Sequence, residues 1–414
     1  MTSVCFYFQV HQPFRLDKHS IFDIGTGKPY FSASDGTDLD NQAILNKVAG
    51  KCYRPMNDLL LGLLERHPQF RVSFSVTGTV LEQLEQYAPD VLDQFKELAK
   101  TGRVEFLNET YHHSLAFIHS PEEFRRQIQM HTDKMKDLFG ITPKVFRNTE
   151  LIYNNDLADV VQELGFTGML AEGADHILGW RSPNFVYRSL GKKPLPLLLK
   201  NYKLSDDIAF RFGEKGWKEY PLSAEKFASW VNSNHGSGDV VNLFMDYETF
   251  GEHQWEDTGI FEFMKALPTE LYRHPDTVFA TPSEVLASAD PVGEIDAPHY
   301  VSWADVERDL SAWHSNDMQA DALRSVFDLE EDVLSSGDEQ LIDDWRRLTT
   351  SDHFYYMCTK WFADGDVHTY FNPYQSPYDA FIAYMNVIHD VQLRVKEIQS
   401  KREAGEPVPL RKVT

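Results

Sequence analysis

Strand-like and helix-like segments alternate along the chain from residue 4 to about residue 290. Such alternation indicates a parallel sheet, because the chain must cross over, usually through a helix, to reach the next parallel strand. The connections also have about the right length for a barrel. Seven segments have convincing strand patterns, namely residues 4–11, 71–78, 104–110, 145–150, 166–172, 206–212 and 240–248, and residues 277–280 form a shorter candidate.

Helical spacing of apolar residues is found between these strands. Ser120, Pro121 and Glu123 form a capping pattern that predicts the start of a helix over residues 121–139. Pro89 predicts a break within the helical segment 80–100. Further helices are expected over residues 53–66, 155–164 and 224–232, and from Thr281 onwards.

After about residue 295 the strand patterns stop and helical patterns follow one another. Trp303, Val306, Leu310 and Trp313 would share one face of a helix over residues 302–313. The other expected helices cover residues 320–335, 338–349, 351–362 and 377–400. We therefore predict a barrel domain over residues 1–295, a helical domain over 296–400 and a frayed tail over 401–414.

The charge and cysteine content exclude several classes of protein. The net charge is −23, from 40 basic and 63 acidic residues, so nucleic acid and anionic membrane surfaces are not expected partners. Cys5, Cys52 and Cys358 are far apart and form no CxxC pair, which indicates neither a disulfide framework nor a zinc site. No signal peptide and no apolar run of the roughly 20 residues that a membrane span needs is recognised, so a cytoplasmic location is expected.

Cofactor motifs are missing at the places where they would be expected. No G-x-G-x-x-G follows the first strand and no P-loop occurs, so we expect no cofactor. A metal site is a weaker alternative, since His11, His112, His113 and Asp246 are ligand types used in zinc-type hydrolysis. These histidines lack H-E-x-x-H spacing, and neighbours on a strand point to opposite faces.

Two apolar runs end in isolated acids. The run over residues 240–245 leads into Asp246 and Glu248, and the strand over 145–150 ends at Glu150. In a parallel barrel the C-terminal ends of the strands surround one mouth. Two acids on different strands suit glycoside hydrolysis, in which one carboxylate attacks the anomeric carbon while the other protonates the leaving oxygen and later activates water. The polar residues that collect at these ends are Gln9, His11, Asn108 to His113, Arg147, Glu150, Glu172, Asp175, Asp246 and Glu248.

Several motifs resemble those of the family-57 glycoside hydrolases, specifically their α-amylase-like branch. They are FQVHQP at residues 8–13, GRVEFLNETYHH at 102–113, FRNTELIYN at 146–154 and MDYETFGEH at 245–253. The segments SWADVERDLSAWHSNDMQ at 302–319 and DGDVHTYFNPYQSPYDAF at 364–381 extend the resemblance over nearly the whole chain. The resemblance implies an incomplete (β/α)7 TIM-like barrel with a C-terminal helical region packed against the cleft.

The resemblance also implies roles for individual residues. It implies cleavage of α-glucosidic bonds with retention of configuration, Glu150 being the nucleophile and Asp246 the general acid/base. His11 and His113 match positions near the bound sugar. One departure is Arg147, where a smaller residue, often glycine, would be expected.

The expected substrate is an α-1,4-glucan or a maltooligosaccharide. An α-amylase is favoured, and a 4-α-glucanotransferase would use the same pair of acids. Branching is disfavoured because the chain is short for it, and a non-catalytic glucan-binding protein is a more remote alternative. Glu248 could supply the like charge that keeps Asp246 protonated. Candidates for contact with the sugar are Trp180, Glu248, Trp303, Asp305 and Trp313. The oligomeric state does not follow from the sequence.

Overall fold

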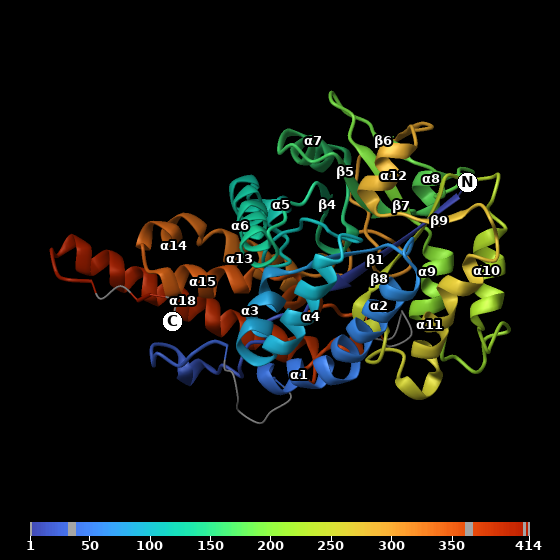
Figure 1. The fold of residues 1–414 in the computed structure, drawn as a ribbon. Helices are drawn as coiled ribbons and strands as arrows, with labels where there is room; N and C mark the ends of the chain where they lie inside the picture. The colour runs from blue at the N-terminus through green and yellow to red at the C-terminus, as the bar shows by residue number, and fades with distance from the viewer. Residues whose placement is uncertain (1, 32–38, 361–366, 409–410, 413–414) are drawn as a thin grey trace. The chain divides into compact units, whose positions relative to one another are not determined.

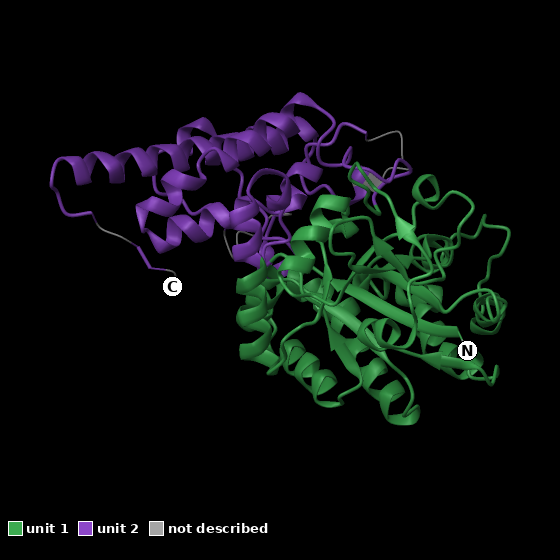
Figure 2. Cartoon of the chain, turned by 90° about the horizontal axis from the view of Figure 1, so that it is seen from above, with its two compact units in different colours: residues 1–11, 45–110, 128–303 green, residues 12–44, 111–127, 304–414 purple. Residues whose placement is uncertain are grey.

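The computed structural model describes residues 2–31, 39–360, 367–408 and 411–412. The chain forms two compact units (Figure 2). The first unit contains Met1–His11, Leu45–Thr110 and Ile128–Trp303, and the second contains Gln12–Ile44, Tyr111–Gln127 and Ala304–Thr414. Each unit is therefore assembled from segments far apart in the sequence, whereas the sequence-based division was one cut near residue 295, which stays a prediction.

The strands of the first unit form two mainly parallel sheets with helices around them (Figure 1). In the first sheet the order is β3 (Val104–Phe106), β2 (Val72–Val76), β1 (Thr2–Val10) and β8 (Val240–Asp246), and β9 (Thr277–Phe279) also pairs with β1. In the second the order is β10 (Glu294–Ile295), β6 (Tyr187–Ser189), β7 (Pro196–Lys200), β5 (Gly168–Glu172) and β4 (Val145–Arg147). All these pairs are parallel except β6 with β7.

Hydrogen bonds connect the two sheets at both of their sides. Next to β3, the Asn108 N–H donates to the carbonyl of Val145 over 3.0 Å, and the Arg147 N–H donates to the carbonyl of Asn108 over 2.8 Å. Between β7 and β8, the Asn201 N–H donates to the carbonyl of Asn242 over 2.9 Å. One buried apolar cluster collects side chains from five of these strands, among them Tyr7, Val145, Leu170, Leu198 and Phe244.

The helices of the first unit confirm most of the sequence-based assignments. A capping box joins Thr281 and Glu284 at the start of α12, and Pro89 begins α4, as their chemistry predicts. The helices are α2 (Arg54–Arg66), α3 (Gly78–Tyr87), α4 (Pro89–Lys100), α7 (Asn155–Glu163), α8 (Asp175–Leu178), α9 (Tyr202–Ala209), α10 (Ala224–Asn232), α11 (Ile260–Leu271) and α12 (Pro282–Ser288). Short helical turns are η2 (Ala49–Tyr53), η3 (Thr149–Leu151), η4 (Tyr247–Thr249) and η5 (Glu256–Thr258).

One predicted strand of the first unit is wrong. Residues 206–212 alternate in polarity, but Asp206 to Ala209 are the last turn of α9. Ser205, Ile208 and Ala209 are buried, which is the spacing of one helix face. The strand at this point of the chain is β7, whose short apolar run Leu197–Leu199 follows Pro196.

The second unit is helical in the part of the chain that the structure describes. Its helices are α5 (Ala116–His119), α13 (Asp317–Phe327), α14 (Glu330–Ser336), α15 (Glu339–Leu348), α16 (Ser351–Tyr355), α17 (Val367–Phe371) and α18 (Pro377–Glu403), with the turn η1 (Ile21–Asp23). Two further helices, α1 (Asn41–Val48) and α6 (Pro121–Phe139), contribute residues to both units. No helix among the described residues is long and apolar enough to span a membrane.

Three helices predicted for this region differ from the structure. Residues 302–313 form turns and no helix, and the positive φ angles of Asp305 and Arg308, both 54°, interrupt any helical run. The segment 320–335 is divided between α13 and α14, and α16 ends at Tyr355, well before residue 362. Residues 361–362 lie outside the described residues, as do residues 409–410 and 413–414 of the predicted frayed tail.

Candidate active site

Polar and charged residues occupy the C-terminal ends of the parallel strands in the first unit. Register brings some of them together directly, since Gln9 pairs with Asp246 across β1 and β8, and Glu172 pairs with Lys200 across β5 and β7. Arg147 is the last residue of β4. Because parallel strands present the same ends on one side of a sheet, each pair lies on the C-terminal side of its own sheet.

Glu150 stands in a strained turn directly after β4. Its φ is 57° and that of Leu151 is 52°, values that non-glycine residues rarely adopt. Such strain persists only where the surrounding structure holds the backbone in place. The side chain of Glu150 is partly exposed, in contrast to the fully buried Arg147 three residues earlier.

The segment 296–303 holds this turn through a series of hydrogen bonds. Tyr153 and Val301 exchange backbone hydrogen bonds of 2.9 Å in both directions, and the Asn155 N–H donates to the carbonyl of Ala297 over 3.0 Å. At the end of the segment the backbone N–H of Trp303 donates to the carbonyl of Glu150 over 3.2 Å. The indole Nε1–H of Trp303 donates to Oε2 of Glu150 over 2.6 Å. Trp303 therefore holds both the backbone and the carboxylate of Glu150.

Two buried cations lie against the Trp303 ring. The Arg147 guanidinium carbon is 4.8 Å from the ring centroid, and Lys200 Nζ is 5.1 Å from it. Each cation also has acidic neighbours: Arg147 Nη1 is 3.9 Å from Glu109 Oε2, and Lys200 Nζ is 3.0 Å from Asp206 Oδ1. The site thus combines several buried charges of both signs.

A buried polar network connects β1, β2 and the residues that follow β3. Gln9 Nε2 donates to the Glu109 carboxylate over 3.1 Å. The hydroxyl groups of Tyr7 and Ser75 each donate to Gln9 Oε1 over 2.7 Å. Burial raises the pKa of Tyr7 far above its usual range, so the phenol stays protonated and can act as a donor.

Asp246 and Glu248 differ in environment although only one residue separates them. Asp246 ends β8 and is partly exposed, whereas Glu248 is buried and accepts a hydrogen bond from the Tyr53 hydroxyl. Burial, and then the charge of Asp246, raises the pKa of Glu248 to about 8. Glu248 is therefore mainly protonated at neutral pH, so it does not supply the like charge that was expected to keep Asp246 protonated.

His11 lies at the end of β1 and is also partly exposed. Its Nδ1 lies 2.9 Å from the Thr77 hydroxyl oxygen at the end of β2. Thr77 is in turn 2.9 Å from the hydroxyl of Thr79. These contacts orient the imidazole from the adjacent strand.

Comparison with known proteins decides the family. Residues 5–298 match the model of glycosyl hydrolase family 57. The chain belongs to glycosyl hydrolase family 57. It is 42% identical over 411 residues to a protein of Methanocaldococcus jannaschii named "Putative alpha-amylase", a match that covers 97% of this chain and 86% of the relative.

Two solved structures show the fold shared within this group. A GH57-type branching enzyme from Pyrococcus horikoshii has a TM-score of 0.71 at 16% identity, over 98% of this chain and 92% of that chain. A 4-alpha-glucanotransferase from Thermococcus litoralis has a TM-score of 0.58 at 19% identity, over 89% of this chain and 54% of that chain. At these identities the likeness concerns the α/β fold alone.

Not all the residues predicted to form the site lie in the same unit of this family-57 protein. Glu150, Asp246, His11 and Glu248 belong to the first unit and lie at strand ends or in the turns that follow them. Trp303 also belongs to the first unit and lies in the loop after β10. Trp180 also belongs to the first unit, after α8, and is 95% exposed.

The other predicted residues belong to the second unit. His113 is buried with a φ of 51°, and its carbonyl accepts a hydrogen bond from the Ser351 N–H over 2.9 Å. Trp313 is 1% exposed. Both carboxylate oxygens of Asp305 lie 3.1 Å from Nε2 of His368. Contact of these residues with a sugar stays a prediction.

Lys200 and Asp206 were missed as charged residues of the site, whereas Glu109 and Glu172 were named among the strand-end residues but not as partners of the two cations. Lys200 could have been found, because the run Leu197–Leu199 ending in Lys200 repeats the strand-to-charge pattern that revealed Glu150 and Asp246. The patterns did not link Glu109 and Glu172 to Arg147 and Lys200, because these contacts join different strands. Asp206, only six residues after Lys200, was assigned to a strand and not to a helix.

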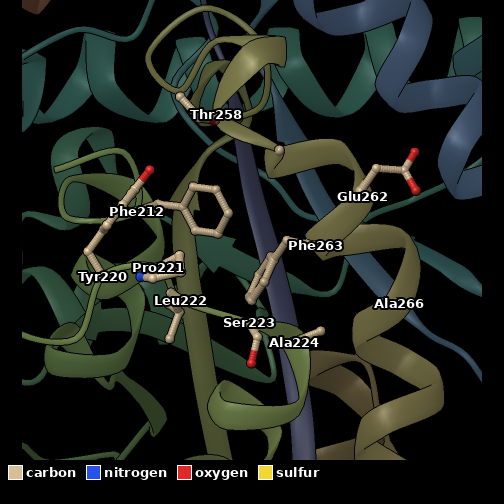
Figure 3. Close-up of a pocket in the computed structure, with 11 residues that line it drawn as sticks. Phe212, Tyr220, Pro221, Leu222, Ser223, Ala224, Thr258, Glu262, Phe263 and Ala266 are labelled. Carbon is tan, nitrogen blue, oxygen red and sulfur yellow. The ribbon is translucent and has the colours of Figure 1, made fainter. Parts of the chain in front are cut away.

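Two other features concern possible ligands. Among residues 2–31, 39–360, 367–408 and 411–412, no group of three or more His, Cys, Asp or Glu side chains could hold a metal ion. A pocket of about 260 Å³ lies beside α10 and α11 (Figure 3). Its lining includes Phe212, Tyr220, Phe263 and Glu262, and none of the strand-end residues described above.

Proposed function

We propose that this family-57 protein cleaves α-1,4-glucosidic bonds of α-glucans with retention of configuration, as an α-amylase does. The observation that carries the proposal is the Glu150 carboxylate, held in a strained turn after β4, on the side of the sheets where Asp246 ends β8. The name of the Methanocaldococcus jannaschii relative supports the same activity.

The proposed reaction has two steps. In the first, the Glu150 carboxylate attacks the anomeric carbon, a carbon–oxygen bond to Glu150 forms, and Asp246 transfers its proton to the leaving glucan oxygen. In the second, Asp246 takes a proton from water, whose oxygen attacks the same carbon and releases Glu150. Two inversions leave the α configuration unchanged.

We further propose that seven parallel strands form an incomplete (β/α)7 barrel. Their order would be β1, β2, β3, β4, β5, β7 and β8. The hydrogen bonds from Asn108 to the β4 backbone and from Asn201 to the β8 backbone support this arrangement, because they connect the two sheets at both sides. The shared apolar cluster of five of these strands supports it as well.

The surroundings of the two acids suggest roles for their neighbours. We assign His11 and Trp303 to contact with the sugar next to the cleaved bond. Both are partly exposed, His11 directly after β1 and Trp303 beside Glu150. Glu248 is assigned to support of Asp246, since it is buried and protonated. His113, Trp180, Asp305 and Trp313 are retained as proposed sugar contacts.

The test is the product profile on maltopentaose. Hydrolysis gives only shorter products. If the Glu150→Gln variant forms no products, their formation requires the proposed nucleophile. Longer linear products would identify the protein as a 4-α-glucanotransferase with the same acids. Products sensitive to isoamylase would indicate branching, which chain length does not exclude because this chain spans 92% of the Pyrococcus horikoshii branching enzyme. Binding of glucan without any new reducing ends would refute the enzymatic proposal.

A further inference from the structure

We propose that Trp303, held by two buried cations, is a positioning residue for the carboxylate of Glu150. The cations are Arg147 and Lys200. The inference rests on the proposed function of Glu150 as the nucleophile. It gives Trp303 a second role beside contact with the sugar and adds Arg147 and Lys200, none of which reacts itself.

Trp303 is attached to Glu150 at two points. Its backbone N–H donates to the Glu150 carbonyl over 3.2 Å, and its indole N–H donates to Oε2 over 2.6 Å. The two bonds together fix the turn and the orientation of the carboxylate plane. A hydrogen bond to an ionised acceptor is short and strong, and it favours the ionised form of the carboxylate, which is the form that attacks.

The ring of Trp303 is held in turn by positive charge. Arg147 and Lys200 approach the ring centroid to 4.8 and 5.1 Å, within the range of cation–π attraction. A cation near the π system withdraws electron density from the indole and makes its N–H a better donor. Both cations are buried, so water screens this effect only weakly.

The Arg147 side chain makes few other polar contacts in the described structure. It is 0% exposed, yet Nε, Nη1 and Nη2 of its guanidinium group make no hydrogen bond, and its ion pair with Glu109 is long at 3.9 Å. A buried guanidinium that lacks hydrogen bonds is costly, and a native protein that keeps one calls for an explanation.

Trp303→Phe is the central variant, because phenylalanine keeps an aromatic ring beside the cations but removes the N–H. We expect kcat on maltopentaose to fall about 10- to 100-fold with little change of KM, the effect of losing one hydrogen bond to a charged group. The acidic limb of the pH–activity profile should move to higher pH. Arg147→Met and Lys200→Met keep the indole and should change kcat in the same direction by about 3- to 10-fold.

Trp230→Phe is the matched control. Lys226 Nζ lies 5.5 Å from the centroid of the Trp230 ring in α10, so this residue has a similar cation contact away from Glu150. Its replacement should leave kcat and the pH profile unchanged. If Trp303→Phe behaves like Trp230→Phe while Glu150→Gln is inactive, the positioning role is refuted and the proposed function stands.

A second measurement needs no substrate. A water-soluble carbodiimide modifies carboxyl groups in their protonated form, and mass spectrometry of peptides locates the modification at Glu150. In Trp303→Phe we expect this modification to extend to higher pH than in the wild-type protein. If the wild-type protein proves inactive on α-glucans, the proposed function fails, and this measurement alone decides the positioning role: an unchanged pH dependence refutes it.

Discussion

The carbonyl oxygen of Lys51 lies 1.9 Å from the position that a Cβ atom on Gly251 would occupy. Gly251 follows the strand and turn that carry Asp246 and Glu248, and its φ is 110°. Both the space and the backbone conformation therefore require glycine at this place. The contact joins the end of this turn to η2, the helical turn that leads into α2.

Gly251→Ala should destabilise the first unit by at least about 2 kcal/mol, because the backbone of Lys51 must move in addition to the strain of a positive φ. Gly259→Ala is the matched control: Gly259 has a φ of 83°, but no atom lies within 4 Å of the position that its Cβ would occupy. That variant should cost only about 1 kcal/mol. Urea unfolding of both variants measures the difference, and equal losses would contradict the prediction.

Glu150→Gly should lose activity by about 10⁴-fold or more, as expected when a nucleophile is removed. Added azide should restore turnover of an activated substrate such as an α-maltosyl fluoride, because the vacated space admits a small anion. The product should be the β-glycosyl azide, formed by a single inversion, and NMR spectroscopy identifies it. A product of α configuration would show that Glu150 is not the nucleophile.

Asp246→Ala should respond differently because the group lost is a proton donor. We expect a loss of about 10²- to 10⁴-fold on maltopentaose, whose leaving group needs a proton. The loss should be much smaller for the first step on an α-maltosyl fluoride, whose leaving group needs little protonation. With azide the product should be the α-glycosyl azide. Equal losses on both substrates would contradict the acid/base role.

The two acids could be predicted from the sequence because each follows an apolar strand, and strand ends of a parallel sheet face one side. The same reasoning would have found Lys200, but β7 begins with Pro196, and the alternating segment after it was assigned as the strand instead. Local patterns therefore gave most of the elements and the proposed catalytic pair.

The contacts around Glu150 could not be predicted, because they join residues far apart in the sequence. Trp303 stands in a segment with helical periodicity, yet its hydrogen bonds go to Glu150 and not to a helix. Nothing near Arg147 in the sequence indicates that it meets Trp303. Periodicity shows which residues share a face, but long-range packing decides whether a helix forms.

Glu248 should make stability depend on pH in a specific direction. Burial, followed by the charge of Asp246, raises its pKa to about 8 in the folded protein, so the folded state binds more protons than the unfolded state between about pH 4.5 and 8. Stability should therefore fall as pH rises through this window, by roughly 4 kcal/mol from this group. Glu248→Gln should remove this part of the fall in urea unfolding measured at pH 5 and pH 8.5.

Glu252, in the same segment, is the control because its pKa is shifted in the opposite direction. Burial acts to raise its pKa, but the hydrogen bond from Lys47 and the charge of Lys51 outweigh burial and lower it. The contribution of Glu252 to stability is therefore present above the pKa that this group has in the unfolded chain, and it is lost as pH falls. Glu252→Gln should therefore leave the fall between pH 5 and 8.5 in place. An unchanged pH dependence in Glu248→Gln would contradict the buried, protonated state of Glu248.

His368 in the second unit should titrate far above an ordinary histidine. Burial acts to lower its pKa, but the hydrogen bond with Asp305 and the nearby Cys358 outweigh burial and raise it to about 9. The stability that this pair contributes should be fully present below about pH 6.5 and be lost as pH rises towards 9. NMR titration of the His368 ring protons measures the midpoint directly.

Asp305→Asn tests the cause of this shift. Without the Asp305 carboxylate, burial still lowers the pKa of His368, so the midpoint of its titration should fall by at least about 1.5 pH units. His112 is the internal control: burial, followed by the charges of Arg346 and Arg347, holds its pKa well below the usual range, so it should stay neutral above pH 6 in both proteins. A wild-type midpoint for His368 near 6.5 would contradict the ion pair with Asp305, because a histidine in such a pair binds its proton more tightly than one in water.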